Sequence, residues 1–153
     1  MGNTIENNAK RLARLAAVQG LYQVTLTQRA PQDIIKEFRA QPEVLLQDVG
    51  EGDAVTNVDQ DLFVDVLTGV TKDTTVLDEM IAGAFDAKVS ADRVEILLRA
   101  ILRAGAYELH HHGSIPAGVI INDYVDVAHA FFGAKEPGLV NAVLDKLGKN
   151  LRS

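Results

Sequence analysis

The stretch VEILLRAILRAGAYEL, residues 94–109, decides the class of fold. Its apolar side chains recur at steps of three and four residues, which is the period of an α-helix, and they leave little polar surface. A helix that is apolar on most sides packs between other helices, so we expect this one at the centre of the molecule. We predict that it spans about 91–112, with Ser90 as its amino-terminal cap and Gly113 beyond its end.

The rest of the chain shows the same helical periodicity, and no stretch alternates with the two-residue period of a half-buried strand. Prolines at 31, 116 and 137 suit the first turn of a helix, because the donor that proline lacks is unpaired there anyway. The sequence predicts an all-α protein of six or seven helices in one domain, residues 1–153. The other expected helices span 4–28, 31–40, 59 to 83 or 85, 116–132, and a last one from Pro137.

Two segments are expected to lie outside the helices or to be loosely held. Residues 41–58 contain Pro42 and the run GEGD at 50–53, lack an apolar helical face, and read as a long polar loop. The polar amino terminus, residues 1–9, is expected to be flexible.

Composition excludes several classes of protein. The chain has 153 residues, of which 47% are hydrophobic and 24% charged, and it has no cysteine. A disulfide scaffold and a thiolate zinc site are therefore excluded. No run of about 18 apolar residues is present and the amino terminus lacks the order of a signal peptide. We expect a soluble cytoplasmic protein that does not bind membranes.

The formal net charge of −6 argues, at face value, against a nucleic-acid partner. The charge is distributed unevenly, however. Residues 1–42 carry six basic and three acidic side chains, residues 43–95 carry three and thirteen, and residues 96–153 carry six and five. The acidity therefore belongs to the middle segment, and the amino-terminal segment has a net charge of +3.

A basic cluster of Lys10, Arg11 and Arg14 lies within about one turn of the first predicted helix. Cations near a helix start face the unfavourable end of the helix dipole, so this placement invites a functional explanation. Such groups can hold phosphates, and Tyr22, further along the helix, could stack on an unpaired base. The alternative is an ordinary solvated helix face.

The four histidines do not form an evident metal site. His110, His111 and His112 point about 100° apart on a helix and cannot converge on one ion. Asp126 and His129 share a helix face, but no other helix repeats that spacing of ligands. We expect surface histidines near a helix end, and neither a metal nor another cofactor.

No enzyme signature stands out, and we expect no catalytic residues. The sequence has no nucleophile elbow, no phosphate-cradling glycine loop and no His-Glu-x-x-His motif. A polar strip of Glu95, Arg99, Arg103 and Tyr107 runs along the most apolar helix. It is either a protein-docking surface, with tyrosine and arginine as anchors, or a set of local ion pairs, Glu95 with Arg99 and Arg103 with Glu108.

Four blocks of sequence recur in a known order and spacing: KRLAR (10–14) followed by AVQGLYQ (17–23); AILR (100–103) leading to YEL (107–109); VIINDYV (119–125) with FG (132–133); and LVNAVLDK (139–146). With these blocks the chain resembles the NusB family of bacterial transcription antitermination factors. Together the four blocks cover the chain from about Lys10 to Lys149.

The resemblance implies two small three-helix bundles packed across each other in one domain. It implies partners as well: NusE, a small-subunit ribosomal protein, with which NusB-like proteins bind the boxA element of nascent RNA. The pair then joins other Nus factors at RNA polymerase and prevents premature termination, notably on ribosomal RNA operons. A NusB-like domain also assists some ribosomal RNA cytosine methyltransferases, and this is one alternative function for the chain. A helical adaptor that binds protein but no nucleic acid is the other.

The resemblance implies a functional role for individual residues of this chain. The implied RNA contacts are Lys10, Arg11, Arg14, Tyr22, Leu139 and Asn141, and the implied protein contacts are Glu95, Arg99 and Tyr107. Leucine stands at 139 where relatives often have an aromatic residue, and it offers no π face for stacking. Leu12 often corresponds to a further arginine, Leu98 to an acidic residue, and His129 to a lysine. Both monomers and homodimers are compatible with the pattern.

Overall fold

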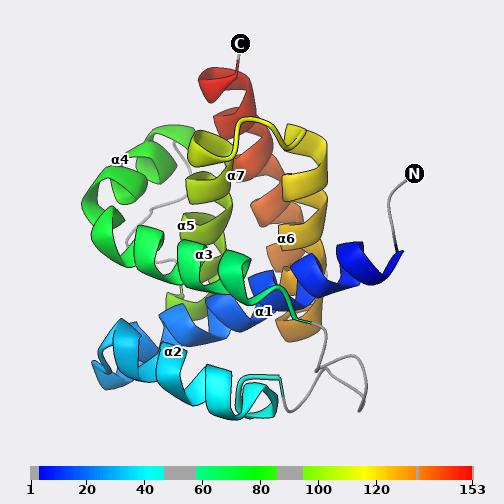
Figure 1. Cartoon of the computed structure of the whole chain (residues 1–153). Helices are drawn as coiled ribbons and strands as arrows, with labels where there is room; N and C mark the ends of the chain where they lie inside the picture. Colours follow the sequence, from blue (N-terminus) through cyan, green and yellow to red (C-terminus); the bar gives the residue numbers. More distant parts are fainter. Residues whose placement is uncertain (1–3, 47–57, 86–94, 134, 153) are drawn as a thin grey trace.

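The computed structural model describes residues 4–46, 58–85, 95–133 and 135–152, and within these it is built of helices alone (Figure 1). The helices are α1 (Thr4–Thr27), α2 (Pro31–Ala40), the short 3-10 helix η1 (Pro42–Val44), α3 (Gln60–Lys72), α4 (Thr74–Ala84), α5 (Ile96–His111), α6 (Ala117–Phe131) and α7 (Lys135–Leu151). The prediction of an all-α protein is confirmed.

The first two helices lie where the sequence placed them. Helix α1 ends at Thr27, and the next residue, Gln28, adopts a positive φ of 58°, which turns the chain. Ala30 is extended, and Pro31 occupies the first turn of α2. Residues 4–9, expected to be flexible, are helical. The predicted loop 41–58 contains η1, and its residues 47–57 lie outside the described part of the chain.

The single helix predicted from Asp59 to 83 or 85 is two helices. The chain breaks at Asp73, whose backbone (φ −104°, ψ 20°) leaves the helical region. Threonines flank the break, and their hydroxyls bond to backbone carbonyls: Thr71 Oγ1 to Leu67 O and Thr74 Oγ1 to Val70 O, both 2.7 Å. Such bonds bend helices, and apolar periodicity alone does not register this change of direction.

The central helix begins later than predicted. Glu95 is extended (φ −57°, ψ 150°), so α5 starts at Ile96 instead of near residue 91. The predicted cap, Ser90, lies outside the described residues. From Leu98 to Leu109 almost every side chain of α5 is buried, and α5 packs against α1, α3, α4, α6 and α7. The expectation of a central position is confirmed.

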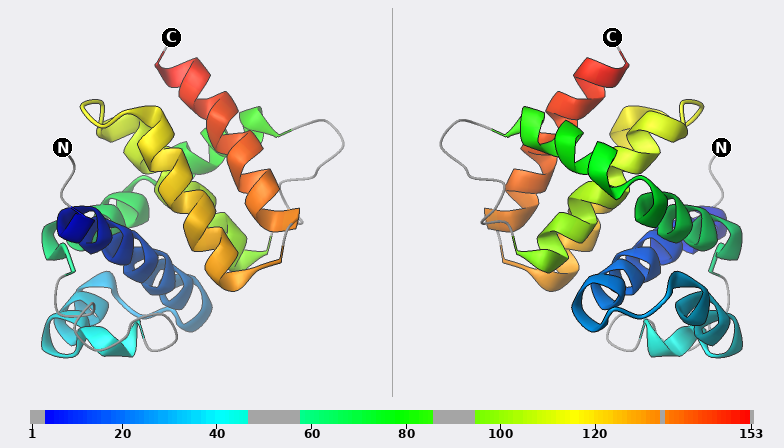
Figure 2. Two further views of the ribbon diagram at one scale, coloured as in Figure 1. Left: turned by 90° about the vertical axis from the view of Figure 1, so that its right-hand side faces the viewer. Right: turned by 90° about the vertical axis from the view of Figure 1, so that its left-hand side faces the viewer.

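The helices form two groups that cross each other (Figure 2). Helices α1, α2 and α3 make one bundle, and α5, α6 and α7 make the other, with α4 lying against α5 and α7. Helix α1 also packs on α5 and α6, so it belongs to the interface between the bundles. This is the arrangement that the resemblance implied.

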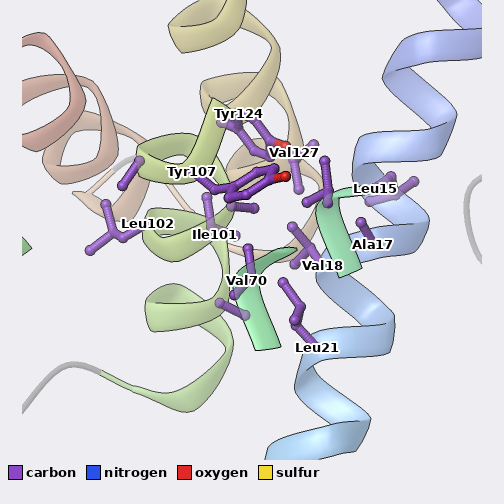
Figure 3. Close-up of a cluster of buried hydrophobic side chains, with 14 of the residues drawn as sticks. Leu15, Ala17, Val18, Leu21, Val70, Ile101, Leu102, Tyr107, Tyr124 and Val127 are labelled. Atoms are coloured by element: carbon purple, nitrogen blue, oxygen red, sulfur yellow. The ribbon is translucent and has the colours of Figure 1, made fainter. Parts of the chain in front are cut away.

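The core fills the space where the bundles meet (Figure 3). Val18 and Leu21 of α1, Val70 of α3 and Ile101 of α5 are each at most 5% exposed. Close approach of α3 to α5 depends on Gly69, because a Cβ atom there would lie 2.2 Å from Cζ of Tyr107.

Candidate functional site

A surface groove of about 660 Å³ lies between the amino-terminal half of α1 and the start of α6. Helix α1 forms one wall, and the residues that lead into α6, with its first two turns, form the other. The lining residues are Asn7, Lys10, Arg11, Arg14, Ile115, Gly118, Val119, Asn122 and Asp123.

The lining of the groove holds more basic than acidic side chains, although the chain as a whole is acidic. Its lining includes three cations, Lys10, Arg11 and Arg14, and one carboxylate, Asp123. Arg11 is the more accessible of the two arginines in the groove lining, with 49% of its side chain exposed, and its Nη2 atom lies 3.7 Å from Asp123 and 3.3 Å from Asp126. Lys10 is half-buried. The groove can therefore attract anionic groups.

Arg14 does not belong to the accessible surface. It is 1% exposed, and each of its three guanidinium nitrogens has a carboxylate partner: Nε and Nη2 donate to Glu108 at 2.7 and 2.8 Å, and Nη1 donates to Asp123 at 2.7 Å. In this structure each guanidinium nitrogen is bonded within the protein, and the implied role as a phosphate contact stays a prediction. Arg14 instead ties α1 to α5 and α6.

The Arg14–Glu108 pair extends into a buried polar network. The hydroxyl of Tyr124 donates to Glu108, and His112 Nδ1 lies 3.0 Å from the other oxygen of the same carboxylate. His112 Nε2 lies 2.6 Å from Oδ2 of Asp65 on α3, whose Oδ1 accepts from Tyr107 at 2.8 Å. The network links α1, α3, α5 and α6.

Protonation states in this network follow from its contacts. Burial opposes charge on Glu108, but hydrogen bonds from Arg14 and His112 lower its pKa to about 2. Hydrogen bonding to Glu108, opposed by burial and reinforced by Asp65, raises the pKa of His112 above its ordinary value. Burial and the bond to Asp65 raise the pKa of Tyr107. The pair Arg14 and Glu108 is therefore charged at neutral pH.

The four histidines differ in their exposure to solvent. His110 and His129 are exposed as predicted, and His111 is exposed beside Asp73 at 3.4 Å. His112 is half-buried between two carboxylates, so the expectation of a surface histidine is wrong there. Among the residues that the structure describes, no group of three or more His, Asp or Glu side chains is placed to hold a metal ion.

The polar strip of α5 is not a continuous surface. Tyr107 is 7% exposed and packs on Gly69, and its implied role as a protein contact stays a prediction. Arg103 makes a two-point bond to Asp78 of α4 at 2.7 and 2.8 Å, instead of pairing with Glu108. Glu95 is exposed at the start of α5, and Arg99 is half-buried, 3.9 Å from Asp78.

The remaining implied RNA contacts lie outside the groove lining. Tyr22 is half-buried on the carboxyl-terminal half of α1, Leu139 is half-buried against the core, and Asn141 is exposed on α7. The lining adds Asn7, Val119 and Asn122, which the sequence did not single out. The block VIINDYV contains two of these residues, but nothing in one sequence shows that it faces α1.

Comparison with known proteins identifies the chain's relatives. A model of the NusB family matches residues 11–149. The chain belongs to the NusB family. It is 43% identical over 145 residues to a transcription antitermination protein NusB of Bradyrhizobium diazoefficiens, covering 95% of this chain and 86% of the relative. A NusB of Nitrobacter hamburgensis is 41% identical over 146 residues, with coverage of 95% and 89%.

Solved NusB structures share the fold. One is NusB of T. maritima, with a TM-score of 0.69 and 22% identity, covering all of this chain and 96% of that one. Another is the crystal structure of antitermination factors NusB and NusE in complex with double-stranded RNA, with a TM-score of 0.71, 24% identity, and coverage of 92% and 96%. Among the described helices of this NusB-family chain, none is long and apolar enough to cross a membrane.

Proposed function

We propose that this chain is a non-enzymatic transcription antitermination factor that binds boxA-type single-stranded RNA together with the ribosomal protein NusE. Its relatives carry the name of transcription antitermination proteins, and a structural neighbour was solved with NusE and RNA. The observation that carries the proposal is the groove beside α1, which Lys10 and Arg11 line on an otherwise acidic chain.

The two accessible cations supply the affinity for RNA. Lys10 and Arg11 line the groove from α1, and phosphates neutralise such groups while releasing counterions. Arg14 contributes indirectly, because its bonds to Glu108 and Asp123 hold α1 against α5 and α6. Affinity for RNA alone is modest and sensitive to salt, since few cations face the ligand and Asp126 competes for Arg11.

A second RNA contact lies away from the groove. We place Tyr22 there as a stacking residue, with Asn141 and Leu139 of α7 as polar and apolar contacts. Asn141 is exposed, and Tyr22 and Leu139 each keep part of their surface accessible. The leucine packs against a base without stacking on it.

NusE binds at the start of α5, where Glu95 is exposed and Arg99 is partly exposed. The ten net negative charges of residues 43–95 favour a basic ribosomal-protein partner. The assembled pair then joins RNA polymerase and other Nus factors in the cytoplasm and supports transcription of ribosomal RNA operons. A second copy of this chain, forming a homodimer, is the alternative partner.

A titration tests the proposal. Labelled boxA RNA and a scrambled control are titrated with this protein, alone and with NusE, at several salt concentrations. We expect a preference for boxA with NusE present. Equal binding of both RNAs would contradict RNA recognition, and loss of all salt-dependent binding would favour the protein-only adaptor. A pull-down that recovers a ribosomal RNA methyltransferase and no NusE would favour the methyltransferase role.

The double variant Lys10→Ala with Arg11→Ala locates the contact. It should weaken RNA binding and make the slope of affinity against salt concentration shallower, by the amount expected for the loss of about two phosphate contacts. NusE binding should be unchanged. If RNA and NusE binding fall together, the α1 cluster serves the fold and the assignment is wrong.

A further inference from the structure

The two walls of the groove differ in chemistry. The α1 wall carries the cations Lys10 and Arg11, whereas the α6 wall presents neutral groups, Val119 and Asn122, beyond its one carboxylate. Val119 is 49% exposed, one of four exposed large apolar side chains in the described part of the chain, and Asn122 is exposed as well. Next to them, the space around the Cα of Gly118 is open.

The carboxylate of the α6 wall does not repel an anionic ligand strongly. Oδ2 of Asp123 accepts from Arg14 at 2.7 Å, and Oδ1 lies 3.7 Å from Arg11. Its charge is therefore balanced within the protein. What the α6 wall offers a ligand is one apolar surface and one amide, placed across the groove from two cations.

An unpaired nucleotide has the matching distribution of groups. Its phosphate is anionic, its base has an apolar face, and the edge of the base carries hydrogen-bond donors and acceptors. An asparagine amide donates and accepts at once, so it can distinguish one base edge from another. A groove of about 660 Å³ also has the size of an ordinary small-ligand site.

We propose that the α6 wall is a base-recognition site, in which one unpaired RNA base lies on Val119 and its edge is bonded by the amide of Asn122. Lys10 and Arg11 hold the phosphates on the opposite wall. Contacts to the base make RNA binding sequence-specific. Contacts between cations and phosphates alone do not. This inference rests on the proposed function and extends it to α6. Paired bases do not enter the site, so its ligand is single-stranded.

Binding of single-base variants of boxA RNA tests the site. In the presence of NusE, Asn122→Ala should lose about 5- to 50-fold in affinity for the preferred RNA and discriminate less at one position. The slope of affinity against salt should not change, because no charge is removed. Asn150→Ala, an exposed amide on α7 outside the groove, is the matched control and should bind as the parent does.

A gain of affinity provides an independent measurement. Val119→Tyr adds a ring at an exposed position where a base is proposed to lie, and it should tighten single-stranded binding several-fold. If Asn122→Ala and Val119→Tyr both bind as the parent does while Lys10→Ala with Arg11→Ala weakens binding, the α6 site is refuted and the proposed function stands. If the cation variant is also unaffected, the RNA surface itself is misplaced. Binding of a duplex as tight as the single strand would also refute the site.

Discussion

Nε2 of His112 lies 2.6 Å from Oδ2 of Asp65, while the other ring nitrogen of His112 lies 3.0 Å from Oε1 of Glu108. Both neighbours are carboxylates, which only accept hydrogen bonds when ionised. A neutral imidazole has one N–H group and can satisfy one of them, whereas the imidazolium donates to both. The geometry therefore favours the charged form, in the same direction as the raised pKa of His112.

The first prediction concerns pH. Because the folded pKa of His112 is raised above 6.5, its contribution to stability is fully present below that value and is lost as pH rises through the folded pKa. His112→Gln should reduce the free energy of unfolding by roughly 1–3 kcal/mol at pH 6, and by less at pH 9. Urea unfolding at both values measures the difference, with exposed His110→Gln as the control. A difference independent of pH would contradict the charged bridge.

The second prediction concerns the buried pair of Arg14 and Glu108. Arg14→Met leaves a buried carboxylate without its partner and should destabilise the fold by about 3–5 kcal/mol. The double variant Arg14→Met with Glu108→Gln should recover part of that loss, because it removes the buried negative charge and keeps an acceptor for Tyr124. Thermal or urea unfolding measures the stability of both variants. An unchanged stability of Arg14→Met would show that the Arg14–Glu108 ion pair does not form in solution.

The ion pair between Arg14 and Glu108 also makes the stability of the fold sensitive to acid. With a folded pKa of about 2 against an ordinary 4.5, Glu108 contributes stability above pH 4.5 that is lost as pH falls toward 2. Arg11→Ala is the matched comparison, since Arg11 is exposed and its pairs are longer. It should leave stability within about 0.5 kcal/mol of the parent and lower RNA affinity.

The third prediction concerns the closest approach between α3 and α5. Gly69→Ala places a Cβ atom 2.2 Å from Cζ of Tyr107, which forces the ring out of its contact with Asp65. We expect a loss of about 1–3 kcal/mol in the free energy of unfolding, despite the better helix propensity of alanine. Gly138→Ala on α7 meets no atom within 4 Å and should instead stabilise by about 0.5–1 kcal/mol. Equal effects of the two variants would contradict the packing.

The fourth prediction concerns the end of the chain. Arg152 donates to the carbonyls of Leu109, His112 and Ile115, so its guanidinium closes the carboxyl end of α5 and the turn into α6. Arg152→Ala should destabilise by about 1–3 kcal/mol and increase amide exchange near residues 109–115. Lys149→Ala, which removes an exposed cation of α7, is the control. Unchanged exchange in Arg152→Ala would show that the cap is not needed.

Most of the helical framework could be predicted because apolar periodicity reports burial directly. Helix α2 and the end of α1 were placed to within about a residue by Pro31 and the preceding polar turn. The break at Asp73 was missed because the apolar face continues through it, although α3 faces α1 while α4 faces α5 and α7. A helix break that depends on tertiary packing changes the local pattern of apolar residues very little.

The candidate site was predicted in part for a similar reason. Lys10, Arg11 and Arg14 share one helix, and spacing alone does not tell which of them meets a neighbouring helix. The partners of Arg14 lie 94 and 109 residues away in the sequence. The polar strip on α5 includes Tyr107 and so favours a surface position for it, but Asp65 and Gly69, both on α3, determine its burial.

The junction at Asp73 also has a mechanical meaning. One residue separates α3, which packs in the first bundle, from α4, which packs in the second, and α1 bridges both. We infer that so short a connection, together with the packing of α1 on both bundles, restricts rotation of one bundle against the other. A ligand bound along α1 and another bound along α5 would then be held at a nearly fixed distance from each other.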